Sequence, residues 1–143
     1  MQLCTASETI SFIKELEEQL AVMCEAIGDQ FGQDTESWKR FAKENRKYAK
    51  QIQMAYQSVI TDAIEGCYAF DLESEDWTQD TALPSGGGYS EAVAKMVAAE
   101  EKIIALYKEG AEQSASLLAD VPRNFKIIVR KRSQRLEQIR ALG

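Results

Sequence analysis

The sequence predicts an all-α fold in which four helices form one bundle. Apolar residues recur at three- and four-residue spacing in four segments, and strict alternation of apolar and polar residues is nowhere sustained. Pro and Gly are sparse, at 2 and 8 residues. A chain of 143 residues can bury its own core, so a single domain over 1–143 is expected. A long connection between the second and third helices predicts two helical hairpins joined by a crossover.

The first helix is expected over about 7–29. Thr5 and Glu8 have the spacing of a capping box, which satisfies backbone N–H groups at a helix start. Gly28 and Gly32 mark the region where the helix ends. Its apolar stripe consists of Ile10, Ile13, Leu16, Leu20, Met23 and Ile27.

The second helix is expected over 34–64, with Asp34 or Thr35 as its cap. Its stripe consists of Trp38, Phe41, Ala42, Ala49, Ile52, Tyr56, Val59 and Ala63. The segment 66–89 is rich in acidic residues and turn formers, so a connection is expected there. Since it is long enough to travel the length of a helix, the second and third helices are expected to run parallel.

The third and fourth helices are expected over 90–117 and 122–141. Ser90 is the expected cap of the third, and Pro122 suits the first turn of the fourth. The third has its stripe at Val93, Val97, Ile103, Ile104 and Tyr107, and the fourth at Phe125, Ile128, Val129, Leu136 and Ile139.

Composition excludes several classes of protein. No apolar run approaches the roughly 18 residues of a membrane span, and no secretory signal is present at the start, so a cytoplasmic protein without a membrane role is expected. The cysteines Cys4, Cys24 and Cys67 lack metal or disulfide spacing, and Cys24 is expected to be a buried thiol. Histidine is absent, which excludes Ser-His and Cys-His catalysis.

Charge is unevenly distributed in a chain of net charge −6. From Arg123 to the end there are seven basic residues and one acidic residue, Glu137. Pairing of this basic helix with acidic neighbours in the bundle is the simplest interpretation. An acidic body would repel phosphates, which argues against a nucleic-acid partner.

The two halves of the chain resemble each other. EEQLAVMCEAIGDQ at 17–30 aligns without gaps on EEKIIALYKEGAEQ at 100–113. Each segment then leads through a loop to a helix that begins with an aromatic residue, Trp38 or Phe125. The order of elements thus repeats, as expected for two related hairpins; the alternative is a chance match between two amphipathic helices made of common helix formers.

On these residues the chain resembles the rubrerythrin and ferritin-like family, in a ferritin-like four-helix bundle. In that family each hairpin gives an inward Glu, an aromatic residue seven positions later, and E-x-x-H on the partner helix. By position the resemblance implies that Glu17 and Glu100 are the two inward carboxylates. Cys24 and Tyr107 then stand at the aromatic positions.

The E-x-x-H positions are not retained. Asn45 and Tyr48 stand there in the first half, and Arg132 and Arg135 in the second. Without histidine the family's full set of iron ligands cannot form. The resemblance therefore implies a divergent member with a degenerate metal site.

Spacing independently places these residues inward. Glu17 lies four residues after Ile13 and three before Leu20, and Glu100 has the same relation to Met96 and Ile103. A central polar layer is predicted, in which the two arginines take the volume and charge of the lost metals and Asn45, Tyr48 and Tyr107 are hydrogen-bond partners. The alternative is that the carboxylates are solvated or lie in a subunit contact, since each has an acidic neighbour. The predicted layer comprises Glu17, Asn45, Tyr48, Glu100, Tyr107, Arg132 and Arg135.

Three functions are compatible with this pattern. The favoured one is a non-catalytic, metal-free binding or assembly protein without cofactor, in which Arg132 and Arg135 could hold a small anionic ligand. The second is an Fe or Mn oxidoreductase whose metal ligands are Glu17, Glu44, Glu100 and Glu101. The third is an adaptor that binds nucleic acid or an acidic partner through outward Arg130, Arg132 and Arg135. The resemblance also implies a homo-oligomer, such as a dimer, with apolar contacts from Met54, Val59 or Ile127.

Overall fold

The computed structural model describes residues 1–59, 70–83, 86–116 and 120–142, and these residues form an all-α structure. Four long helices are present in this part of the chain: α1 (Ala6–Phe31), α2 (Thr35–Val59), α5 (Tyr89–Gln113) and α6 (Asp120–Leu142). None of these described helices is long and apolar enough to cross a membrane. The helix content of the described residues confirms the expected all-α class.

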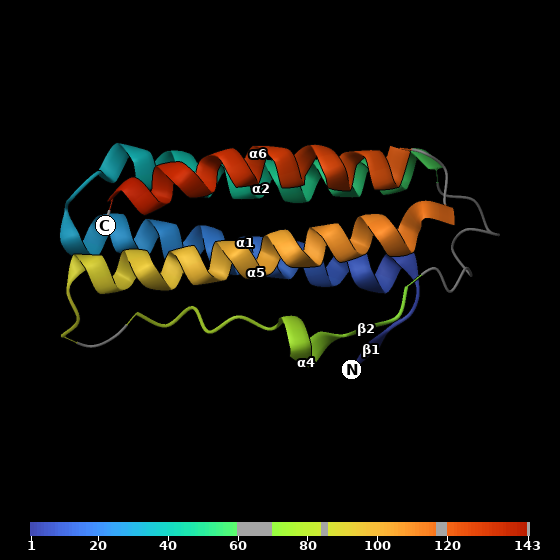
Figure 1. Ribbon diagram of the computed structural model, residues 1–143, viewed down its shortest axis with the longest axis horizontal. Helices are drawn as coiled ribbons and strands as arrows, with labels where there is room; N and C mark the ends of the chain where they lie inside the picture. Colours follow the sequence, from blue (N-terminus) through green and yellow to red (C-terminus); the bar gives the residue numbers. More distant parts are fainter. Residues whose placement is uncertain (60–69, 84–85, 117–119, 143) are drawn as a thin grey trace.

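The helices form two layers in Figure 1. The pair α2 and α6 forms one layer, and the pair α1 and α5 forms the other. The connection between the two hairpins runs back alongside α5. As a result α2 and α5 point in the same direction, as expected for a crossover. One seam of the bundle, between α1 and α5, therefore has the crossover beside it, whereas the seam between α2 and α6 lies on the far side from it (Figure 1).

The ends of the helices follow local chemistry. At the start of α1 the Thr5 hydroxyl accepts from the Glu8 backbone N–H while the Glu8 carboxylate accepts from the Thr5 backbone N–H, as the capping box predicted. At its end Gly32 adopts a left-handed conformation, with φ of 62°, and its N–H donates to the Gly28 carbonyl. The expected cap at Ser90 is wrong: α5 begins at Tyr89 with Gly88 as its N-cap, so Ser90 lies inside the helix.

The crossover has more structure than the sequence suggested. A short strand β2 (Leu72–Glu73) pairs antiparallel with β1 (Gln2–Leu3) and is followed by the one-turn helix α4 (Ser74–Trp77). The third predicted helix ends earlier than expected, because α5 gives way to a 3₁₀ turn, η1 (Ser114–Ser116). Positions 60–64 of the second predicted helix, position 117 of the third and Cys67 lie outside the described residues.

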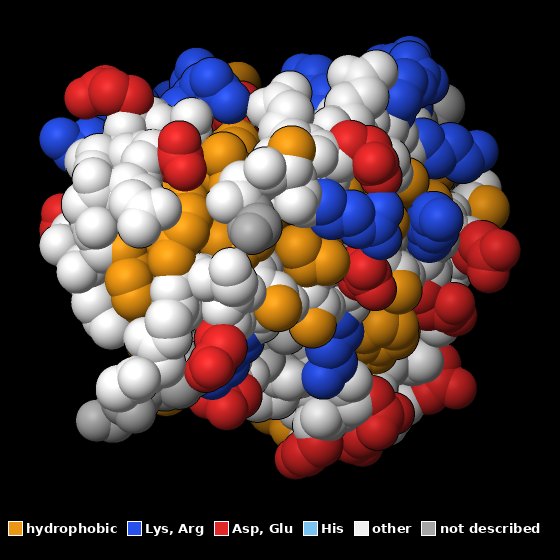
Figure 2. All heavy atoms as spheres, turned by 60° about the vertical axis from the view of Figure 1, so that its left-hand side comes forward, with side chains coloured by type: hydrophobic (Ala, Val, Ile, Leu, Met, Phe, Trp, Pro, Cys, Tyr) orange, Lys and Arg blue, Asp and Glu red, His pale blue; other side chains and the backbone are white. Residues whose placement is uncertain are grey.

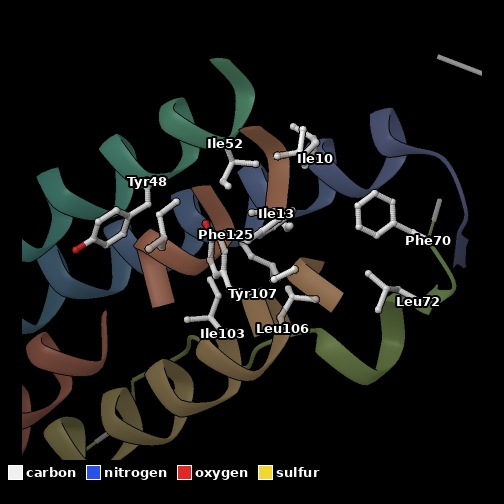
Figure 3. Close-up of a cluster of buried hydrophobic side chains, with 14 of the residues drawn as sticks. Ile10, Ile13, Tyr48, Ile52, Phe70, Leu72, Ile103, Leu106, Tyr107 and Phe125 are labelled. Atoms are coloured by element: carbon white, nitrogen blue, oxygen red, sulfur yellow. The ribbon is translucent and has the colours of Figure 1, made fainter. Parts of the chain in front are cut away.

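Two apolar cores fill the bundle. Figure 3 shows the first, which includes Ile13 of α1, Ile52 of α2 and Phe125 of α6 together with Phe70 and Leu72 of the crossover. The second lies around Trp38, Phe41, Met96 and Ile139. Each group of mutually packed side chains stabilises the bundle by removing apolar surface from water. Neither core contains the buried charged residues described next.

Exposed apolar side chains are few among the described residues. Met54 is 57% exposed, whereas Ile127 is only half-buried, and the side chain of Val59 lies outside the described residues. A subunit contact was expected at these three positions. Of the two whose side chains are described, Met54 has the exposure that such a contact needs and Ile127 does not.

Candidate functional site: a buried layer of two carboxylates and two arginines

The central feature of the bundle is a group of charged side chains that are excluded from solvent. Glu17 of α1 and Glu100 of α5 are 0% exposed, as is Arg132 of α6, and Arg135 is 3% exposed. They occupy apolar stripes because each is spaced three or four residues from core positions of its helix. The alternative of solvated carboxylates is wrong.

Arg132 joins the two hairpins through its guanidinium group. Its Nη1 donates to Glu100 Oε1 at 2.8 Å, and its Nη2 donates to Glu17 Oε1. The same group lies over the ring of Tyr48, 4.8 Å from the ring centroid, and 5.6 Å from that of Tyr107. One cation therefore bridges both carboxylates while its faces contact aromatic rings, an arrangement that suits a planar delocalised charge.

Arg135 contacts Glu100 through two parallel hydrogen bonds. Its Nη2 donates to Oε2 at 2.7 Å and its Nε donates to Oε1 at 3.2 Å. Its Nη1 donates to the Phe41 carbonyl at 3.0 Å and lies 3.5 Å from Glu44 Oε1. This bidentate geometry fixes Arg135 more firmly than a single contact would.

The neutral members of the layer have three different roles. The Tyr107 hydroxyl donates to Glu17 Oε2 at 2.6 Å, as expected of a hydrogen-bond partner. The expectation for Asn45 and Tyr48 is wrong. Asn45 Nδ2 contacts Cys24 Sγ at 3.8 Å, and Tyr48 supplies a ring face to both arginines, since it forms no hydrogen bond within the described part of the chain.

The two carboxylates differ in electrostatic environment. Burial alone raises the pKa of a carboxyl group. At Glu100 the attraction of Arg132 and Arg135 outweighs burial and the pKa is lowered, whereas at Glu17 burial outweighs Arg132 and the Tyr107 hydrogen bond, and the pKa is raised. Burial also raises the pKa of the Cys24 thiol to about 12, which suits the expected inert, buried cysteine.

The layer is not fully satisfied. Arg132 Nε and Asn45 Oδ1 are buried and have no hydrogen-bond partner within the described residues. Each such atom costs roughly 1–3 kcal/mol relative to a satisfied one. Apolar side chains of similar volume would often be as stabilising, so the layer is not explained by stability alone.

The four carboxylates of the alternative metal site do not converge. Arg132 lies between Glu17 and Glu100, and Glu101 is 51% exposed at the surface, where it pairs with Arg140. Glu44 is 33% exposed, on the far side of Arg135. Within the described ranges, no group of three or more Cys, Asp or Glu is placed to hold a metal ion. This set of residues does not fit a carboxylate metal centre, because two guanidinium groups occupy the contacts that a metal would need.

Beside the layer, a polar cleft of about 440 Å³ opens between α2 and α6. Each wall has residues at positions i, i+3, i+4 and i+7, which lie on one face of a helix. The cleft was not predicted from the sequence. A signal for it was present, because each residue of the α2 wall lies 87 positions before a residue of the α6 wall, the same separation as between Trp38 and Phe125. The walls consist of Glu44, Lys47, Tyr48 and Gln51 from α2, and Lys131, Gln134, Arg135 and Gln138 from α6.

The basic residues of the chain are concentrated in α2 and α6, the two helices that line the cleft. Of the 17 Lys and Arg residues, 13 lie in α2 and α6, which have only four acidic residues between them. On the face that Figure 2 shows, most blue side chains lie in the upper half and most red ones toward the lower right. The adaptor hypothesis needed Arg130, Arg132 and Arg135 to face outward. Arg130 is exposed, but the other two are buried.

Comparisons of the chain with family models, with curated proteins and with solved structures give no match. The function must therefore be inferred from the chemistry of the layer and of the cleft beside it.

Proposed function

We propose that this chain is a non-catalytic, metal-free binding protein built on a ferritin-like bundle, in which a Glu/Arg layer replaces a di-iron site. The observation that carries the proposal is the position of Arg132, whose guanidinium contacts Glu17 and Glu100 together. In a carboxylate-bridged metal centre those two side chains would share the metal ions. Here a fixed cation takes that place and leaves no exchangeable ligand position for chemistry.

Charge balance supports the same proposal. Two carboxylates and two guanidinium groups are neutral together, so the buried layer needs no further cation. A metal ion would have to displace Arg132 into an apolar interior, where an unpaired charge costs several kcal/mol. The competing oxidoreductase would also need Glu44 and Glu101 to turn inward, away from Arg135 and Arg140 respectively.

The test is metal uptake by the full chain. The purified protein is incubated with Fe(II) or Mn(II), excess metal is removed, and bound metal is measured by plasma mass spectrometry. Fewer than about 0.1 equivalents per chain are expected, and close to about two equivalents, the content of a two-metal site, would refute the proposal.

Thermal unfolding provides a second readout. A ligand that binds only the folded state raises its stability, so a resident metal would raise the melting temperature. No change with Fe(II) or Mn(II) is expected. A stabilisation that chelator reverses would contradict the proposed replacement of metal by arginine.

A further inference from the structure

The cleft between α2 and α6 has the size and the chemistry of a ligand site. Its volume of about 440 Å³ is within the range of roughly 300–1,000 Å³ typical of small-molecule pockets. Its walls are polar, with two lysines, an arginine, a glutamate, a tyrosine and three glutamines. A polar ligand with several hydrogen-bonding groups suits such walls better than an apolar one.

Two of the three positive charges that line the cleft, those of Lys47 and Lys131, are not neutralised by described neighbours, whereas Arg135 is paired with Glu100. Lys47 and Lys131 are exposed and have no ion-pair partner among the residues described. Gln134 between them in the lining also has no hydrogen-bond partner within those residues. Two cations and an amide are therefore available to a ligand at no loss of existing contacts.

Glu44 lines the cleft, and its carboxylate lies where the anionic group of a ligand would bind. Its Oε1 is buried, makes no hydrogen bond within the described part of the chain, and lies 3.5 Å from Arg135 Nη1. This weak contact leaves that edge of Arg135 available to a stronger acceptor. Arg135 itself is held in place by Glu100 and by the Phe41 carbonyl, so the position of its charge is fixed before a ligand arrives.

We propose that this cleft binds a small, polar phosphate ester, such as a phosphorylated sugar. Its phosphate would contact Lys47, Lys131 and the Nη1 of Arg135 that now faces Glu44, and its hydroxyl groups would contact the glutamine side chains. A phosphate is favoured over a single carboxylate because the fork of Arg135 is already occupied by Glu100, and the two remaining lysine charges match the roughly double negative charge of a phosphate monoester. Lysines are point charges that suit a group with several oxygens.

This inference rests on the proposed function as a binding protein, but it can fail separately. Metal uptake reports on Glu17, Glu100 and Arg132, whereas the ligand would touch the cleft walls. A protein that binds metal and also glucose 6-phosphate refutes only the metal-free layer. A protein that binds neither refutes only the inference drawn here.

The experiment is an isothermal titration of the full chain with three probes: glucose 6-phosphate, inorganic phosphate and succinate. Glucose 6-phosphate is expected to bind most tightly, inorganic phosphate more weakly because it lacks hydroxyl groups, and succinate most weakly. Absence of binding by glucose 6-phosphate at millimolar concentration would overturn the inference. Succinate binding as tightly as glucose 6-phosphate would overturn the assignment to a phosphate.

Matched variants locate the site. Lys47→Ala and Lys131→Ala should each weaken glucose 6-phosphate binding about tenfold, which corresponds to about 1.4 kcal/mol. Lys126→Ala is the control, since Lys126 is an exposed lysine of α6 that lines a different hollow, beside α5. An equal loss in Lys126→Ala would show diffuse attraction and overturn the site.

Two further measurements test the position of the anion and the alternative of a nucleic-acid ligand. Glu44→Gln removes a negative charge beside Arg135 and should tighten binding several-fold, whereas an unchanged affinity would place the anion elsewhere. A mixed-sequence single-stranded oligonucleotide should not compete with glucose 6-phosphate. Competition that weakens steeply with salt would assign the basic face to nucleic acid instead.

Discussion

The two hairpins place different chemistry at equivalent positions. The first gives the layer one acid and no cation, whereas the second gives it one acid and both cations. Glu100 is consequently bound by two arginines and Glu17 by one. The two hairpins thus carry different charge patterns, and neither is neutral at this level without the other. The equivalent pairs are Glu17 and Glu100, Cys24 and Tyr107, Asn45 and Arg132, and Tyr48 and Arg135.

The largest effect should come from removing the cation that joins the hairpins. Arg132→Met leaves Glu17 buried with only the Tyr107 hydroxyl as partner, so the free energy of unfolding should fall by about 3–5 kcal/mol. Chemical denaturation measures it, with exposed Arg130→Met on the same helix as the control. Adding Glu17→Gln to Arg132→Met should recover part of the loss. Equal, small effects of Arg130→Met and Arg132→Met would show that the layer is not energetically coupled.

The two carboxylates should respond unequally to neutralisation. Glu100→Gln removes the carboxylate that pairs with both arginines and leaves only Glu17 for Arg132, so it should cost about 3 kcal/mol, whereas Glu17→Gln relieves a poorly compensated buried charge and should cost about 1 kcal/mol or less. Urea unfolding of both variants at neutral pH gives the comparison. Similar costs would mean that the second arginine does not distinguish the halves.

The same inequality should appear in the dependence of stability on pH. The pKa of Glu100 is lowered from its ordinary value of 4.5, so its contribution is present above pH 4.5 and is lost as pH falls through the folded value. The pKa of Glu17 is raised, so its contribution is present below pH 4.5 and is lost as pH rises through the folded value. Unfolding midpoints across acidic pH should show a flatter acid limb in Glu100→Gln, and Glu17→Gln should reduce the loss above pH 4.5. Parallel curves for the two variants would contradict this assignment.

A smaller difference between the halves is expected where each hairpin closes. A Cβ at Gly110 would lie 2.9 Å from Phe125 Cε1, whereas one at Gly28 would lie 3.2 Å from Trp38 Cβ. Gly110→Ala should therefore cost about 1–2 kcal/mol net of the helix propensity it gains, and Gly28→Ala less than about 1 kcal/mol. Thermal unfolding of both variants tests this order. The reverse order would show that the ring of Phe125 can move aside.

The smallest effect on stability is expected from an ion pair at the surface. Arg46 pairs with Glu18 and Glu25 across the first hairpin, but it is 39% exposed. Arg46→Ala should lower the free energy of unfolding by about 0.5 kcal/mol at low salt and by less at high salt. Denaturation at two salt concentrations checks this. A loss as large as that of Arg132→Met would remove the distinction between buried and exposed arginines.

Much of this architecture could be predicted because the sequence is locally consistent. The stripes predicted four helices, and the spacing of Glu17, Glu100 and Arg132 from core positions predicted their burial. The short strand pair could not be predicted, because β1 and β2 have two residues each and pair across almost half the chain. The partners of individual side chains could not be predicted from residue spacing either. Tyr48 presents its ring face to Arg132, and Asn45 contacts Cys24, because of side-chain rotamers that are set by packing in the core.

The bridge formed by Arg132 has a consequence for the order in which the domain can assemble. Glu17 and Arg132 are separated by 115 positions along the chain. During synthesis from the N-terminus, α1 and α2 are complete long before the guanidinium that neutralises Glu17 exists. Closing the first hairpin early would bury an unpaired acid, so completion of the interior has to wait for the last helix. The buried charge of the first helix is therefore neutralised only when the last helix has been made.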